Sequence, residues 1–488
     1  MPLFIENFWI IIKGSQRKPI LFIYLPIIYQ HLFIMKRVFF YALTILCSMF
    51  VFSCGEKKDD ASKNDTVLKP DDQKKFLNDV AIELSKSVSA SDFDDLNIFV
   101  RDLIDLYEDY DWSTIEDNMN SAFDESKDFI TSYREDAGSY SSYQYYNHYE
   151  VYDVVLMLSN FTGHYTAQRG SWKYTPADDL QFSFKDLDRN DCVLTLVKEG
   201  DETELRLPSD SRYINSYSSF NGQTLIMTWN YYYEKLQYVV SVPEKITVSL
   251  TRAGENVVTA TIMINIGSLT RSDYFDFGRS SLESSVEIVL NNGYRTSWNG
   301  TYTANDKLSL NGRVSKSDNE LISCVVSGDP SGFPSMVFSD DFDEDEFEDL
   351  LDDNDVNVEN LYVSASFLSK AKIIGKVADA RMVKNLVDKL DKNRTNERRF
   401  KEYLNQINEK LDVGLYYNGS DKRQAYLEFE AFSEYDRYED KDYWNFEPVM
   451  VFSDETRVSC EVFFDEEDFR KALDAFEELG KDFEDLVD

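Results

Sequence analysis

The stretch Val286–Trp298, VEIVLNNGYRTSW, has the pattern that decides the fold. Apolar and polar residues alternate on both sides of Asn292-Gly293, and an Asn-Gly pair between two alternating runs is the strongest short-range signal for a β-hairpin. The same period of two extends from Gly163 to about Val337, with further turns predicted at Glu199-Gly200-Asp201, Ala253-Gly254 and Ser317-Asp318-Asn319. The sequence therefore predicts an antiparallel meander of many strands, which has to curl or split into two sheets rather than stay flat.

Helices are predicted before this meander. Apolar residues between positions 76 and 88 recur at helical spacing, and Ser91 is expected to open a second helix. Ser113 and Glu116 have the spacing of a capping box, with Trp112 before them and an apolar stripe after them. Residues 74–135 are therefore expected to be helical.

After Asp340, helices and strands alternate. The sequence predicts one or two strands between Leu361 and Val377, helices at Met382–Leu390 and Phe400–Leu411, and hairpins across Asn418-Gly419 and within Val449–Phe464. A last helix is expected to bury Phe469, Leu473, Phe476, Leu479 and Phe483. The predicted fold class is α+β: N-terminal helices, a large curved antiparallel β-meander that is open-barrel-like or two-layered, and a C-terminal mixed α/β part.

The N-terminus has the parts of a secretory signal. Met35-Lys36-Arg37 precedes an apolar run of Val38–Phe52, which is shorter than the ~20 residues of a spanning helix. The residues Val51 to Cys54 resemble the bacterial lipobox, which implies cleavage before Cys54 and lipidation of its thiol. Two or three acyl chains anchor a protein stably where one does not. The alternative is an ordinary cysteine after a transmembrane helix.

The flanks of this signal bear on topology and location. Residues 1–34 are expected to precede the true start at Met35, the alternative being an additional membrane segment. The polar run from Gly55 to about Gln73 is predicted to be a flexible tether. Its Lys58-Asp59-Asp60 resembles the export signal of Bacteroidetes surface lipoproteins. We therefore expect an outer-membrane lipoprotein that faces outward, with the periplasmic face as the alternative.

Pattern and composition divide the chain into six predicted segments. They are a mis-called upstream start (1–34), a signal peptide (35–53), an acidic tether (54–73), a helical region (74–160), an antiparallel sheet region (161–338) and a mixed α/β region (339–488).

The composition excludes some classes of partner. The formal net charge is −38, and removal of the basic signal makes the remainder more negative. Such a surface repels phosphate backbones, so nucleic-acid binding is not expected. Cys192, Cys324 and Cys460 are far apart and odd in number, which indicates buried small hydrophobes rather than a disulfide framework.

No segment carries a catalytic or metal-binding motif. The acidic run Ser339–Asp355 has no glycine for a calcium loop and has the apolar spacing of a solvated helix instead. His148 and His164 lie near the entry to the sheet, without the spacing of zinc ligands. We expect no metal, no cofactor and no enzyme activity.

A tyrosine-rich stretch is the most suggestive binding candidate. Exposed aromatic rings stack on sugars or fill a groove on a partner, although such rings more often pack inside a protein. The candidates are Tyr140, Tyr143, Tyr145, Tyr146, Tyr149 and Tyr152.

The segments Val242–Gly254, Pro448–Asp454 and Phe464–Phe469 resemble uncharacterised Bacteroidetes lipoproteins, a resemblance that implies no activity. The first hypothesis is a non-enzymatic protein, anchored by lipid at the cell surface, that binds a glycan, a protein or a nutrient-related partner. The second is a carrier of lipid or another apolar ligand in an open-barrel cavity. The predicted curved sheet with helices resembles the open barrel of periplasmic lipoprotein carriers. The third is a carboxylate-based hydrolase, which needs two facing acids.

The lipid anchor is testable by metabolic labelling. Cells that express the chain and take up an alkynyl fatty acid should label the wild type, because Cys54 supplies the acylated thiol, and should not label Cys54→Ala. Equal labelling of the two proteins would contradict lipidation at Cys54.

Overall fold

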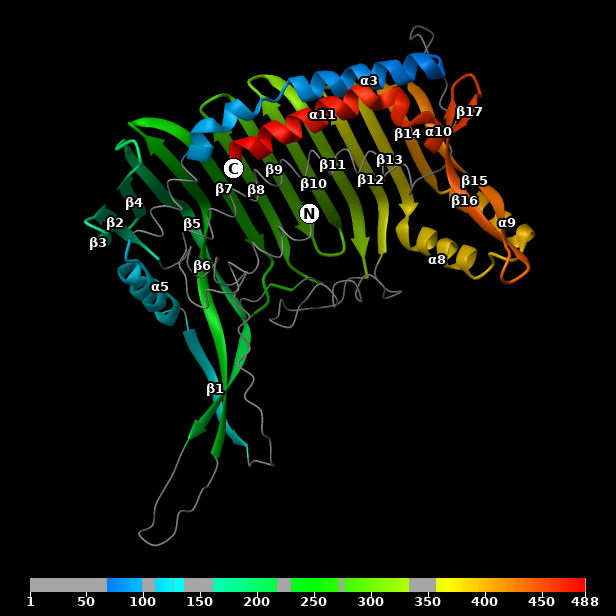
Figure 1. The fold of residues 1–488 in the computed structure, drawn as a ribbon. Helices are drawn as coiled ribbons and strands as arrows, with labels where there is room; N and C mark the ends of the chain where they lie inside the picture. The colour runs from blue at the N-terminus through cyan, green and yellow to red at the C-terminus, as the bar shows by residue number, and fades with distance from the viewer. Residues whose placement is uncertain are drawn as a thin grey trace. The chain divides into compact units, whose positions relative to one another are not determined.

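The computed structural model describes residues 68–98, 110–125, 127–135, 161–216, 230–271, 275–276, 278–332 and 357–487 (Figure 1). The chain forms two compact units. Of the described residues, the first unit takes those within Ile98–Glu244 and Val248–Asn256, and the second takes the remainder. Helices near both ends of the described chain accompany mostly antiparallel strands, so the α+β prediction is confirmed at that level.

The first unit contains α5 and six strands. Its elements are α5 Ser113–Glu125, β1 Lys127–Glu135, β2 Gly163–Gln168, β3 Ser171–Thr175, β4 Leu180–Lys185, β5 Asp191–Ser216 and β6 Asn230–Arg252. β2 pairs antiparallel with β3 but parallel with β4, and β4 pairs antiparallel with β5. The alternation of Leu180, Phe182 and Phe184 is confirmed, because all three are buried.

Three local predictions in this unit were wrong. Residues 127–135 form β1, not helix, and pair antiparallel with β6. The predicted turn at Glu199–Asp201 lies inside the continuous strand β5, where Gly200 has φ +86°. Glycine permits this irregularity within a strand, so its presence did not mark a turn. Helix α5 begins at Ser113 itself, and Asp111 accepts the Ser113 N–H at 3.0 Å in place of the predicted capping box.

The second unit contains a meander of strands that pair in chain order. They are β7 Glu255–Gly267, β8 Ser281–Leu290, β9 Tyr294–Thr303, β10 Lys307–Lys316, β11 Asn319–Ser331, β12 Asn357–Phe367, β13 Ala371–Asp379, β14 Leu411–Tyr417, β15 Arg423–Asp436, β16 Lys441–Phe452 and β17 Arg457–Ser459. Strands β11 and β12 pair across the expected boundary at residue 338, so the sheet continues through it. Among the described pairings none joins β7 to β17, so this sheet is not closed.

The predicted turn chemistry fits the hairpins of this meander. At the β14–β15 turn, Asn418 and Gly419 have φ +52° and +68°. Two consecutive positive φ values are the signature of the turn that matches strand twist, and Asn-Gly adopts them at little cost. The hairpins at Asn292-Gly293 and Ser317–Asn319 are likewise confirmed.

Four helices accompany the described part of this meander. They are α3 Pro70–Lys86 with the 3-10 helix η1 Ala90–Phe93, α8 Ala380–Asp391, α9 Glu397–Asn408 and α11 Glu466–Val487, and a short turn α10 Cys460–Phe463 precedes the last. α3 and α11 lie side by side, and Lys74 of α3 pairs with Asp468 of α11 at 2.5 Å (Figure 1). α8 contacts β12 and β13, α9 contacts β14 and β15, and Leu386, Leu390, Phe400 and Leu404 of the two helices are buried in one core. None of the described helices is both long and apolar enough to cross a membrane.

Two C-terminal predictions need correction. The strand expected at Val458–Phe464 ends after Ser459, whose hydroxyl accepts the Val462 N–H at 3.3 Å and starts α10. Helix α11 exists as predicted, but Leu473 is 40% exposed and its neighbour Ala472 is buried instead. Leu479 is buried as predicted, and Phe469 and Phe476 are partly buried, so only Leu473 departs from the predicted stripe among the described side chains.

Candidate functional site

The two faces of the second unit's sheet differ in chemistry. Side chains alternate between faces along each strand, and paired residues on neighbouring strands share a face. One cross-strand row consists of Ile262, Val286, Trp298, Gly312 and Cys324. A Cβ atom at Gly312 would lie 2.6 Å from Cζ3 of Trp298, so the indole packs directly over this glycine. This face is therefore mainly apolar.

Burial on the apolar face falls from one end of the strands toward the other. Val258 and Tyr294, near the β8–β9 turn, are 4% and 3% exposed. Farther along the same strands, Ile264 and Trp298 are only half-buried, and Leu310 on β10 is 40% exposed. We call the half-buried part the apolar strip; its central members are Ile262, Ile264, Val286, Trp298, Tyr302 and Leu310.

The buried end of the apolar face is covered by the segment Leu68–Ile98, which contains α3 and η1 and which we call the strap. The ring of Phe93 in η1 lies 5.0 Å from that of Tyr294. At the other end of the strap, the ring of Phe76 lies 4.5 Å from that of Tyr417 on β14. The strap therefore crosses the strand ends from β9 to β14 and borders the apolar strip.

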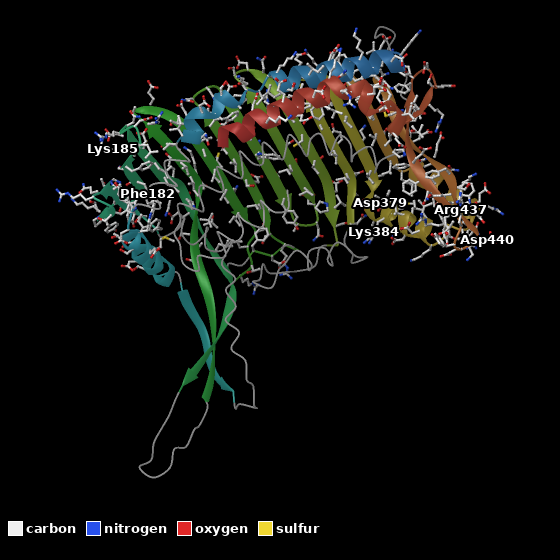
Figure 2. The ribbon with its side chains drawn as sticks, viewed as in Figure 1. Phe182, Lys185, Asp379, Lys384, Arg437 and Asp440 are labelled. Atoms are coloured by element: carbon white, nitrogen blue, oxygen red, sulfur yellow. The ribbon has the colours of Figure 1, made fainter. Side chains whose placement is uncertain are left out.

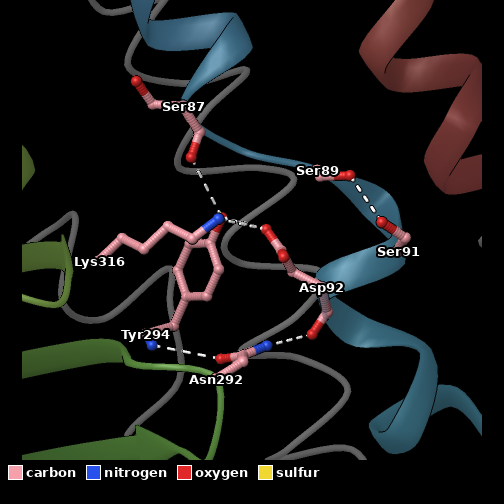
Figure 3. A network of polar contacts seen from close by, with 7 residues as sticks. All are labelled: Ser87, Ser89, Ser91, Asp92, Asn292, Tyr294 and Lys316. Atoms are coloured by element: carbon pink, nitrogen blue, oxygen red, sulfur yellow. Dashed lines mark hydrogen bonds and ion pairs between the residues drawn. The ribbon is translucent and has the colours of Figure 1, made fainter.

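Polar contacts fasten the strap at η1 (Figure 3). Asp92 Oδ2 accepts hydrogen bonds from Lys316 Nζ at 2.6 Å and from the Tyr294 hydroxyl at 2.9 Å. Asn292 donates from its side chain to the Asp92 carbonyl oxygen. Burial opposes ionisation of Asp92, but the hydrogen bonds from Lys316 and Tyr294 outweigh it and hold the Asp92 pKa below its ordinary value. We call Asp92, Tyr294 and Lys316 the latch.

A second set of polar contacts fastens the strap at α3. The side chain of Gln73 is fully buried, accepts the Tyr417 hydroxyl at 3.0 Å, and donates to the Gln424 carbonyl oxygen at 3.3 Å. Between the two ends, Lys370 Nζ lies 2.6 Å from Glu83 Oε1. The strap is thus held by hydrogen bonds and ion pairs in addition to its buried Val80, Leu84 and Phe93.

Several candidates from the sequence lie outside the described residues. These are Cys54, the acidic run Ser339–Asp355, His148 and all six tyrosines from Tyr140 to Tyr152. Their predicted roles stay predictions.

The other candidates, His164 and the three cysteines, lie among the described residues. His164 Nε2 is 2.7 Å from Asp179 Oδ1 on the first unit, and both side chains are more than one third exposed. Cys192 and Cys460 are buried, Cys324 is half-buried, and none of the three forms a disulfide. The described residues contain no group of three or more His, Cys, Asp and Glu side chains placed to hold a metal ion.

Sequence reasoning missed an exposed aromatic group at the tip of the β15–β16 hairpin. Tyr438 is fully exposed and Tyr435 is 55% exposed, and Arg437 and Asp440 lie at the same tip (Figure 2). The Tyr435 hydroxyl donates to Asp440 Oδ1 at 2.6 Å, which orients its ring. The alternation of aromatic and acidic residues at 435–443 was the available signal.

Comparison of the chain with protein-family models, with curated proteins and with solved structures finds no match. Its function is therefore argued from its own residues.

The latch predicts a pH-dependent stability. Because the folded-state pKa of Asp92 is lowered, its ionised form stabilises the fold above the unfolded-state pKa, and this contribution is lost as the pH falls through the folded-state value. Asp92→Asn should lower the free energy of unfolding by about 1–3 kcal/mol at pH 7, and by less as the pH falls below about 4. Urea unfolding at a series of pH values measures both effects.

Glu477→Gln is the matched control, since it removes an acid from an exposed pair with Lys481. It should change the free energy of unfolding by less than about 0.5 kcal/mol. The role of the latch is refuted if the two variants are equally stable at pH 7.

Proposed function

We propose that this protein is a non-enzymatic, membrane-anchored lipoprotein that binds the acyl chain of a lipid or similar amphiphile on its apolar strip. The observation that carries the proposal is the partial exposure of Ile264, Trp298 and Leu310 on a mainly apolar sheet face. Covering the exposed part of one such side chain contributes up to about 1 kcal/mol. A ligand that covers several of them therefore gains substantial binding free energy without any new polar contact.

The size of the apolar strip favours an acyl chain over a folded protein. Strands β7 to β11 lie about 4.8 Å apart, so the strip is about 19 Å long across them, and three same-face positions on a strand span about 14 Å. The resulting area of about 270 Å² is on the order of the largest apolar patches of monomers, which are often functional. It is far below the ~800 Å² that each partner contributes to a standard protein interface. An acyl chain of one membrane leaflet extends about 15 Å and fits the long dimension.

Two further predictions from the sequence belong to this proposal. Lipidation at Cys54 would hold the protein at the outer membrane, where acyl-chain ligands are present. Curvature of the unclosed sheet around the ligand would give the open-barrel form expected from the long meander.

The described carboxylates with lowered pKa values are held by hydrogen bonds and ion pairs from other residues of the protein. Burial opposes ionisation of Asp186, but hydrogen bonds from Asn190 and Arg252 hold its pKa below the ordinary value. Arg252 Nε lies 2.7 Å from Asp186 Oδ2, and this pair fastens the β4–β5 turn to β6. These contacts favour a binding function over the carboxylate-based hydrolase, which needs one acid with a raised pKa.

Binding of a neutral fluorescent monoacylglycerol tests the proposal. The chain from residue 54 with Cys54→Ala lacks the anchor and can be titrated without detergent. The probe should bind saturably, and Ile264→Gln or Leu310→Gln should each weaken binding about fivefold to tenfold, because each removes about 1 kcal/mol of apolar contact.

Met263→Gln is the control variant. Met263 is adjacent to Ile264 in sequence and is 51% exposed, but it lies on the opposite face of β7. Its affinity for the probe should equal that of the parent chain. Absence of saturable binding, or equal loss in all three variants, would rule out the apolar strip as the ligand site.

A further inference from the structure

Two polar side-chain groups lie at the centre of the apolar strip. Three cross-strand rows run through Ile262, Ile264 and Ile266 from β7 to β11, and none of their residues is charged. Ser284 on β8 and Trp298 on β9 stand in these rows, and both side chains are half-buried. Neither Ser284 Oγ nor Trp298 Nε1 has a hydrogen-bonding partner among the described residues.

The Ser284 hydroxyl is open to a ligand because the residue paired with it is a glycine. Ser284 pairs with Gly300 of β9, and Ser284 Oγ would lie 3.4 Å from a Cβ atom at that glycine. Since Gly300 has no side chain, no methyl or larger group stands beside the hydroxyl within this pair. Ser284 and Gly300 are both partly exposed, so a ligand on the apolar strip can reach the hydroxyl.

The indole of Trp298 is turned so that its N–H faces away from β10. Its Cε3 and Cζ3 atoms lie over Gly312 of β10, 2.8 and 2.6 Å from where a Cβ atom would be, and Nε1 is on the opposite edge of the indole. Trp298 lies two positions before Gly300 on β9, so Ser284 and Trp298 are diagonal neighbours about 7–8 Å apart. A ligand oxygen between their side chains can therefore form hydrogen bonds with both.

These two groups define what a ligand of the apolar strip has to carry. The indole N–H is a donor only, and a serine hydroxyl can donate as well as accept. A carbonyl oxygen accepts two hydrogen bonds, so it satisfies both groups at once. A bare hydrocarbon chain would instead remove water from both groups and leave them unpaired, which weakens binding by about fivefold or more for each group.

We propose that Ser284 and Trp298 bind the ester carbonyl oxygen of an acyl lipid, so that the apolar strip selects acyl esters over alkyl ethers and hydrocarbons. This inference rests on the proposed acyl-chain function and adds the direction of the ligand. The acyl chain runs over Leu310 and Val326, which continue the row of Ser284 and Gly300 on β10 and β11, and the head group lies toward β7. The distance from β8 to β11 is about 14 Å, close to the ~15 Å of an acyl chain, whereas the strip has only β7 on the other side.

Competition between an ester and an ether of equal chain length tests this proposal. Monopalmitoylglycerol has the carbonyl group and monohexadecylglycerol lacks it, and each is used to displace the fluorescent monoacylglycerol from the Cys54→Ala chain. The parent chain should bind the ester about tenfold more tightly than the ether. Ser284→Ala and Trp298→Phe should each lower this preference about threefold, because each removes one hydrogen bond to the carbonyl oxygen.

Ser285→Ala is the matched control, since Ser285 is the next residue of β8 and lies on the opposite face. It should keep the ester preference of the parent chain. The preference is a ratio of two affinities within one variant, so a change in the folded fraction cancels. Equal affinities of the parent chain for ester and ether, or the same preference in Ser284→Ala, Trp298→Phe and Ser285→Ala, overturns this proposal and leaves the acyl-chain site in place. Failure of both lipids to bind overturns the acyl-chain function and this proposal together.

Discussion

Backbone pairing in chain order is the constraint on which the second unit depends. Each strand from β8 to β16 hydrogen-bonds to its neighbours along the sequence, and this register places one set of alternate residues on one face throughout. Apolar residues such as Ile264 and Trp298 consequently collect on one side, and Ser285 and Asn299 collect on the other. A shift of one residue in any hairpin would exchange the two sides. The apolar strip is thus a consequence of this register.

The strap adds a polar restraint to this apolar arrangement. Val80, Leu84 and Phe93 bury its inner side, but the latch and the buried Gln73 fix its position over particular strand ends. A buried hydrogen-bonding group that loses its partner costs about 1–3 kcal/mol, so such contacts select one position strongly. The strap therefore covers the strand ends and leaves the apolar strip half exposed.

Local patterns in the sequence predicted much of the fold. Alternation and Asn-Gly turns located β8, β9, β14 and β15, and helical spacing located α3, α8, α9 and α11, because these signals depend on neighbouring residues alone. β1 and the turn assigned to Gly200 were misread, since pairing with β6 decides both and is not local. The latch was inaccessible for the same reason: Asp92 and Lys316 are 224 positions apart.

Carbene footprinting of the protein tests the central claim that the apolar face stays open. Photolysed diazirine labels any side chain that solvent reaches, with little dependence on chemistry. Ile264 and Leu310 should be labelled several times more strongly than Phe400 and Leu404, which are each 2% exposed in the α8–α9 core. Labelling of Ile264 and Leu310 as weak as that of Phe400 and Leu404 would contradict an open apolar strip, and with it the acyl-chain site.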